Sequence, residues 1–131
     1  MTQLAEIQLA SLRGQLENQR QKLRNDIREE LLRSDTEEYG SLAGQVHDAG
    51  EEAVADLLAD INVTNLSRHI GELREVEAAL QRIRVGAYGN CVDCGDDIPF
   101  ERLQANPMAQ RCVEHQELHD KQYDGAKKPS M

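Results

Sequence analysis

Three cysteines and one histidine in the C-terminal third have the residue types and spacing of a metal site. Two residues separate Cys91 from Cys94, two separate Cys112 from His115, and seventeen lie between the pairs. Two ligands spaced in this way can bend around one ion, and two such pairs complete a tetrahedron. Thiolate and imidazole ligands favour zinc over harder ions. The spacing therefore predicts one zinc ion, structural because four protein ligands leave no open coordination position.

Several alternatives to this ligand set remain open from the sequence. His119 lies four residues after His115, on the same face of an expected helix, and is a rival fourth ligand. The three cysteines could be ordinary free thiols, and Cys91 and Cys94 could form a redox pair, although no βαβ pattern surrounds them. Clustered thiols in a reducing compartment indicate metal more often than disulfide. Gly95 directly follows Cys94, where a tight turn with positive φ is expected.

Two long amphipathic helices are predicted to precede this module. Apolar residues recur at three- and four-residue spacing in the first helix, which has Thr2 as its expected N-cap and runs to about residue 33. Glycines at 40, 44 and 50 predict a turn region over residues 34–50, with at most a fraying helix between them. A second striped helix is expected over residues 51–85. The two should form an antiparallel coiled-coil hairpin that buries one stripe on the other.

The resulting prediction is a mainly α protein in three parts. Residues 1–85 form the coiled-coil hairpin, with an acidic tip near residues 35–60. Residues 86–124 form a small zinc finger followed by a short C-terminal helix, and residues 125–131 form a flexible tail. Aromatic residues are only 3% of the chain, so aliphatic side chains must supply the buried area, which suits helix-on-helix packing.

Charge is concentrated in one stretch of an acidic chain. The formal net charge is -9, and residues 34–67, here called the acidic segment, contain eight carboxylates and no Lys or Arg. Such a balance argues against general nucleic-acid binding and against attachment to an anionic membrane. No apolar run has the length of a membrane span, and the N-terminus lacks a secretory pattern, so a cytoplasmic location is expected. The acidic segment is either a solvated surface or the working end of the hairpin.

A long motif around the predicted ligands resembles the DksA/TraR family of bacterial transcription regulators. Its first part is Y-G-N-C-V-D-C-G-D-D-I over residues 88–98, and its second is R-L-Q-A-N-P-M-A over residues 102–109. The last part is C-V-E-H-Q over residues 112–116, where His115 replaces the fourth cysteine that the family commonly has. The motif covers about thirty residues, and the preceding hairpin extends the resemblance over most of the chain.

The resemblance implies direct binding to bacterial RNA polymerase as a monomer, with the hairpin entering the secondary channel. DksA-like members carry a tip pattern D-x-x-D-x-A that approaches the catalytic centre. Here Asp48 and Ala53 match it, and Glu51 replaces the second aspartate. Asp48 and Glu51 could equally cap the second helix. The effect would be on promoter complexes, without catalysis by the chain itself.

The resemblance also implies basic contacts to the alarmone guanosine tetraphosphate. Carried over without gaps, these positions are Arg68, Glu75 and Gln116, of which only Arg68 is basic. A carboxylate at position 75 opposes an anionic ligand, so weak or absent alarmone dependence is predicted, unless Arg74 or Arg82 compensates.

Two other functions compete with this interpretation. A nucleic-acid-binding zinc finger would need a basic face, whereas residues 89–123 carry more acidic than basic side chains. A small hydrolase using His47, Asp48 and Glu51 would need a nucleophile, a phosphate loop or a second metal set, and none accompanies them.

Overall fold

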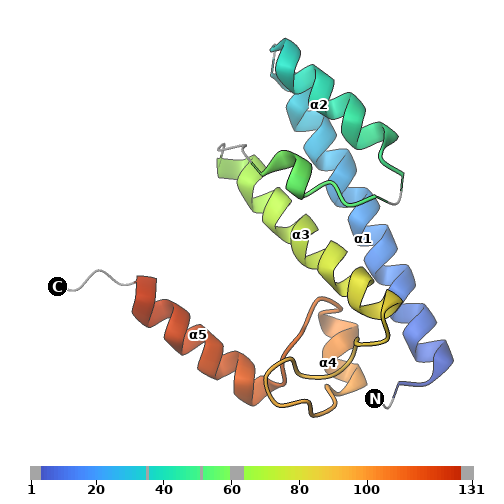
Figure 1. The fold of residues 1–131 in the computed structure, drawn as a ribbon, viewed down its shortest axis with the longest axis vertical. Coiled ribbons are helices and arrows are strands. Elements are labelled where there is room, and N and C mark those ends of the chain that lie inside the picture. Colours follow the sequence, from blue (N-terminus) through green and yellow to red (C-terminus); the bar gives the residue numbers. More distant parts are fainter. Residues whose placement is uncertain (1–3, 35, 51, 60–63, 128–131) are drawn as a thin grey trace.

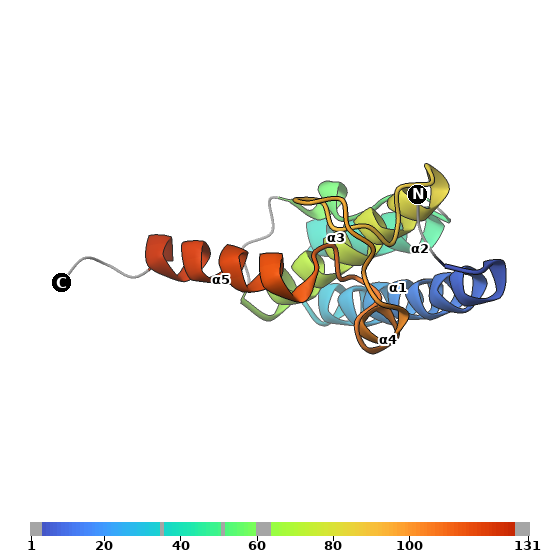
Figure 2. The same ribbon diagram turned by 90° about the horizontal axis from the view of Figure 1, so that it is seen from below.

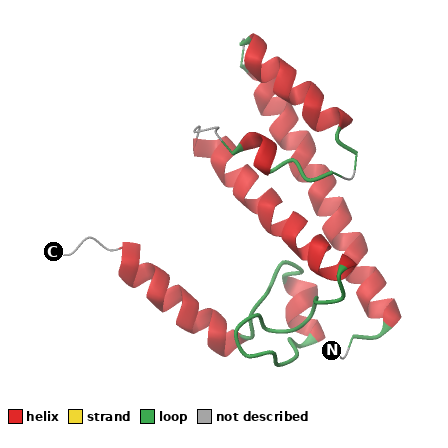
Figure 3. Ribbon diagram, in the orientation of Figure 1, coloured by secondary structure: helices red, strands yellow, loops and turns green. Residues whose placement is uncertain are grey.

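The computed structural model describes residues 4–34, 36–50, 52–59 and 64–127. Five α-helices and one short 3-10 helix follow one another: α1 (Glu6–Arg33), α2 (Glu37–Asp48), η1 (Asp56–Leu58), α3 (Thr64–Arg84), α4 (Phe100–Ala105) and α5 (Val113–Lys127). In the described part of the chain, β structure is limited to one bridge between Asn90 and Asp97 (Figure 3). The predicted mainly α class is confirmed.

The helical arm is built on α1, which packs against both α2 and α3 (Figure 1). Helix α3 reaches the C-terminal part of α1, where Nδ1 of His69 lies 3.3 Å from Oε1 of Glu30. Both partners run antiparallel to α1. The buried faces are aliphatic and come from the predicted stripes: Leu12, Leu16, Leu23, Ile27 and Leu31 of α1, and Leu66, Ile70, Leu73, Val76 and Ala79 of α3. Burial of these side chains is the main stabilising contribution to the arm.

The predicted turn region over residues 34–50 is wrong for most of its length, because α2 occupies residues 37–48. The hydroxyl of Thr36 caps this helix by accepting from the backbone N–H of Tyr39 at 3.3 Å. Ala43 and Val46 are buried in the shared core. Their packing on α1 compensates for the low helix propensity of the two glycines inside α2. Gly50, with φ of 59°, comes after the helix.

The predicted second helix over residues 51–85 is also wrong in its first part, since α3 begins only at Thr64. Residues 52–55 are non-helical. The carbonyl of Glu52 accepts from Arg24 of α1, and the N–H of Val54 donates to Glu77 of α3. Residues 60–65 read Asp-Ile-Asn-Val-Thr-Asn, a run of residues with below-average helix propensity. The predicted long hairpin is therefore a three-helix arm, in which α2 and α3 both pack on α1.

A compact loop module and two further helices complete the chain at the base of the arm, beside the N-terminal end of α1 (Figures 1 and 2). Helix α4 contacts α1, whereas α5 projects away from the arm. The flexible tail predicted over residues 125–131 is wrong for residues 125–127, which belong to α5. The predicted N-cap Thr2 and the end of the tail, residues 128–131, lie outside the described residues. Among those described, no helix combines the length and the apolar character needed to cross a membrane.

Candidate functional site

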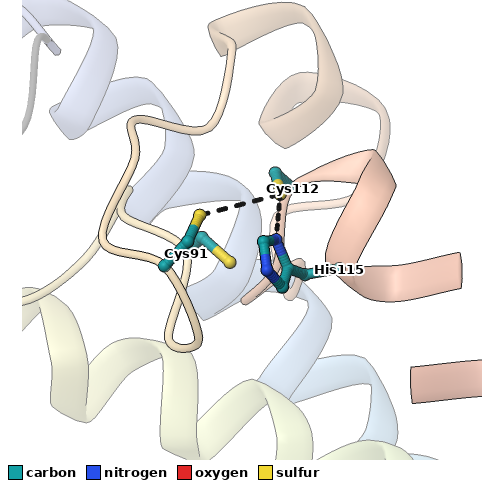
Figure 4. Close-up of side chains that lie close together, drawn as sticks. Cys91, Cys112 and His115 are labelled. Atoms are coloured by element: carbon teal, nitrogen blue, oxygen red, sulfur yellow. Dashed lines mark hydrogen bonds between the residues drawn. The ribbon is translucent and has the colours of Figure 1, made fainter. Parts of the chain in front are cut away.

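The four predicted metal ligands come together from two tight turns at the base of the arm. Cys91 and Cys94 lie in the loop after α3, Cys112 immediately precedes α5, and His115 is in the first turn of α5 (Figure 4). All four ligand atoms lie within 4.8 Å of one another. The Sγ atoms of Cys94 and Cys112 are 3.9 Å apart, and Cys112 Sγ is 3.1 Å from Nδ1 of His115.

Backbone hydrogen bonds hold the two turns in register. The N–H of Gly95 donates to the carbonyl of Cys91 at 2.9 Å, and Gly95 has φ of 80°, as predicted for this turn. The N–H of Val92 donates to the carbonyl of Gln110 at 2.8 Å, which joins the first turn to the stretch of chain leading into the second. A side chain at position 95 would be strained, because L residues with a Cβ rarely adopt this φ.

The electrostatics of the cluster favour a cation. Burial opposes ionisation of the Cys91 thiol, but backbone N–H donors at Cys112, Cys94 and Asp93 outweigh it and lower its pKa to about 6. For Cys94, the N–H of Asp96 favours the thiolate, yet burial and the neighbouring thiols together raise the pKa to about 11. The thiol of Cys94 thus hydrogen-bonds to the thiolate of Cys91, and a divalent ion bound at their centre would favour the deprotonated form of both.

The donor set and spacing fit one zinc ion. A zinc–sulfur distance of about 2.3 Å in tetrahedral geometry requires ligand atoms roughly 3.8 Å apart, close to the separation of Cys94 and Cys112. His119 is not in the cluster that the described residues form. It lines a hollow together with Glu75.

Comparison with known proteins agrees with this site. Residues 86–121 match the family model described as the prokaryotic DksA/TraR C4-type zinc finger. The chain is 31% identical over 110 residues to the RNA polymerase-binding transcription factor DksA of Caulobacter vibrioides, covering 82% of this chain and 77% of that protein. The chain belongs to the DksA/TraR family.

Two further comparisons describe the extent of the likeness. General stress protein 16O of Bacillus subtilis is 42% identical over 84 residues, which is 62% of this chain and half the length of that protein. The structure of transcription factor DksA2 from Pseudomonas aeruginosa superposes with a TM-score of 0.59 at 27% identity, covering 91% of this chain and 88% of that one. The predicted zinc cofactor is confirmed by the match to a C4-type zinc finger and by the cluster of three cysteines and one histidine.

The predicted tip residues lie elsewhere than at the end of the arm. The far end is where α1 gives way to α2 (Figure 1), whereas Asp48 ends α2, after that helix has returned along α1. Its carboxylate side chain is 81% exposed and lies 3.1 Å from Nδ1 of His47. No helix begins at Asp48, so its predicted N-cap role is wrong. Ala53 is exposed, and Glu51 lies outside the described residues.

The three positions carried over for the alarmone are divided in space. Glu75 and Gln116 line one hollow of about 580 Å³ between α3 and the zinc module. Arg68 is exposed on α3 and is not among the residues lining that hollow. Arg74 is engaged with Asp56 at 2.6 Å, and Arg82 is half-buried. Neither lines the hollow, so the suggested compensation by these two arginines is not seen.

Sequence reasoning missed two other arginines in this hollow. Arg102 and Arg111 both line it, and the Nε–H of Arg102 donates to the carbonyl of Arg111 at 3.1 Å. Arg111 also pairs with Asp93 at 2.8 Å. Arg102 belongs to the family motif, so its position near the zinc ligands could have suggested it.

Sequence reasoning also missed a buried ion pair in the arm, Arg24 with Glu77. Glu77 falls seven residues after Ile70, and Arg24 seven residues before Leu31, so both occupy positions on apolar stripes. A charged residue at such a position in each of two helices is the signal that was available.

Proposed function

We propose that this protein regulates transcription by binding bacterial RNA polymerase directly, in the cytoplasm and as a monomer. The observation that carries the proposal is the family membership combined with the exposed carboxylates of the half of the arm that contains α2 and η1, here called the acidic half. Asp48, Glu52 and Asp56 are all exposed, as are the two carboxylates that begin α2. Relatives in the family are named RNA polymerase-binding transcription factors.

The arm supplies the reach for contact inside a channel. Helix α1 has 28 residues, which at about 1.5 Å per residue corresponds to roughly 40 Å. We infer that the arm enters the secondary channel of the polymerase with its acidic half leading. The leading half then includes both the far end, with Glu37 and Glu38, and the segment from Asp48 to Ala53.

The mode of action follows from charge. Exposed carboxylates near the catalytic centre would interact with its metal ions or with the basic loops around them, and so change the stability of promoter complexes. The zinc module holds the base of the arm and contributes no reactive group. The protein thus acts by binding to RNA polymerase and performs no reaction. Its relatives are likewise named RNA polymerase-binding transcription factors.

Dependence on guanosine tetraphosphate is proposed to be weak. The hollow that contains Glu75 and Gln116 offers Arg102 and Arg111, but Arg111 is paired with Asp93, and Glu75 and Asp120 add negative charge to the lining. An anionic nucleotide would meet these carboxylates in a partly desolvated interface, where like charges are costly.

The test is binding to core RNA polymerase followed by site-specific crosslinking. A photoreactive side chain at position 48 should crosslink to polymerase segments lining the channel near the active site. The same group at position 118, on exposed Leu118 of α5, is the control and should not reach those segments. Absence of any complex with core polymerase at micromolar concentrations would refute the proposal.

A further inference from the structure

A buried charge pair connects the two long helices of the arm beside the segment that follows α2. Arg24 of α1 is 6% exposed and is the only buried charged residue in the described part of the chain. Its Nη2 lies 3.8 Å from Oε2 of Glu77 on α3, and the side chain of Glu77 is 12% exposed. Charges removed from water in this way require hydrogen bonds as well as a partner.

Those hydrogen bonds go to the main chain of residues 50–55. The guanidinium of Arg24 donates to the carbonyls of Gly50 and Glu52. The carboxylate of Glu77 accepts the N–H of Val54 at 2.8 Å and the N–H of Ala55 at 3.2 Å. The two side chains therefore satisfy four backbone groups of a non-helical stretch, which would otherwise lose partners on burial.

The pair holds this stretch from one side only. Val54 and Ala55 are 1% and 2% exposed and belong to the core, whereas Glu52 and Ala53 are exposed. Because the hydrogen bonds of Arg24 and Glu77 to this stretch go to its main chain, they leave the exposed side chains at positions 52 and 53 available to a partner. The arrangement therefore fixes the main chain of this stretch and leaves the side chains of Glu52 and Ala53 exposed to a binding partner.

We propose that Arg24 and Glu77 are positioning residues that fix the main chain at Gly50, Glu52, Val54 and Ala55 in the conformation needed to act on RNA polymerase. This inference rests on the proposed function. Holding a loop in its active conformation before binding reduces the ordering cost at the moment of contact. A loosened segment would therefore still enter the polymerase with the arm but would act on it less.

The experiment compares two variants with a matched control. Glu77→Gln keeps the shape of the side chain but removes the charge and one of its two acceptors. Arg24→Lys keeps the charge but loses the forked geometry that reaches two carbonyls. Glu72→Gln removes the same charge from α3 without touching residues 50–55. Far-ultraviolet circular dichroism and zinc content establish that each variant is folded.

Three quantities are then measured for each protein. They are the affinity for core polymerase, the change in open-complex lifetime at saturating protein, and amide hydrogen exchange at Val54 and Ala55. For Glu77→Gln and Arg24→Lys we expect affinity within about threefold of wild type, a maximal effect reduced at least about fivefold, and exchange accelerated about tenfold or more. Glu72→Gln should match wild type in all three.

Each other outcome is decisive. Accelerated exchange with a full maximal effect would mean that the pair only stabilises the fold, and the inference would be wrong. The inference would also be wrong if amide exchange at Val54 and Ala55 were unchanged in the variants. It would be wrong too if weaker binding to polymerase alone explained the smaller change in open-complex lifetime. A wild-type protein that neither binds polymerase nor alters open complexes would instead overturn the proposed function itself.

A single substitution could leave one buried charge unpaired and prevent folding. The double variant Arg24→Gln with Glu77→Gln removes both charges together and avoids that problem. It should fold, show fast exchange at Val54 and Ala55, and have a reduced maximal effect. A full effect from this double variant would contradict the inference.

Discussion

The hydroxyl of Tyr88 donates a hydrogen bond of 2.8 Å to the backbone carbonyl of Pro107, so the exit from α3 is tied to the loop that leads to Cys112. Tyr88 is 2% exposed and precedes the first pair of zinc ligands, whereas Pro107 lies between the two pairs in sequence. The contact therefore holds the loop that leads to Cys112 against the exit of α3, because both residues are buried.

Replacing Tyr88 by Phe should destabilise the protein. The substitution leaves the Pro107 carbonyl without its donor, and an unsatisfied buried acceptor costs about 1–3 kcal/mol. Denaturant unfolding in the presence of saturating zinc measures the change. Tyr39→Phe in α2 is the matched control and should have a smaller effect. Equal free energies of unfolding for Tyr88→Phe and wild type would show that the bond contributes nothing.

The same tyrosine predicts a loss of stability at alkaline pH. Burial raises the pKa of Tyr88 to about 12, and the nearby charge of Arg82 only partly opposes this. The folded state therefore favours the protonated phenol, so its stabilising contribution is complete below pH 10 and is lost as pH rises from about 10 towards 12. Unfolding curves across this range should converge for wild type and Tyr88→Phe. A difference that stayed constant with pH would contradict the assignment.

Loss of one zinc ligand should release the metal and disorder the base of the molecule. Cys94→Ser is expected to contain less than one zinc per chain, because a hydroxyl is a poor replacement for a thiolate. Much of the helical signal should remain, since the arm has its own aliphatic core. Elemental analysis of protein purified without chelator, with circular dichroism, tests both points. His115→Cys and His119→Ala should keep the metal, and zinc loss in His119→Ala would reopen the choice of fourth ligand.

Removing the charge of Asp48 should reduce the effect of the protein on transcription without reducing its binding to RNA polymerase. The carboxylate is exposed at the C-terminal end of α2, where a negative charge opposes the helix dipole. Asp48→Asn should therefore leave stability unchanged within about 0.5 kcal/mol. Polymerase binding should persist while the effect on a sensitive promoter in vitro falls. An unchanged effect would remove Asp48 from the mechanism.

Reversing the charge at position 75 should increase the response to guanosine tetraphosphate. Glu75→Lys replaces an anion by a cation in the hollow that also contains Gln116. In a partly desolvated interface this should change the binding free energy of the nucleotide by a few kcal/mol, or its affinity by roughly tens- to thousands-fold. In-vitro transcription with and without the nucleotide, on a polymerase lacking its separate alarmone site, measures it. Strong synergy already present in the wild-type protein would refute the proposed role of Glu75.

Features that depend on residues close in sequence were predictable. The zinc ligands lie within two short turns, and their atom types select the metal, so spacing alone indicated the cluster. The aliphatic stripes of α1 and α3 repeat with the helical period, so the periodicity by itself identifies their buried faces. The positive φ of Gly95 was likewise predictable, because this glycine directly follows Cys94 in the tight turn that contains two zinc ligands.

Features that depend on distant contacts were decided only by the tertiary structure. Helix α2 forms despite its glycines because Ala43 and Val46 pack against the apolar surface of α1. The non-helical course of residues 52–55 depends on Arg24 and Glu77, whose side chains bond to backbone groups 22 to 28 residues away. Local propensity carries no information about such partners. The sequence by itself determined the chemistry of the metal centre and the aliphatic faces of α1 and α3, and long-range packing decided where the acidic residues lie along the arm.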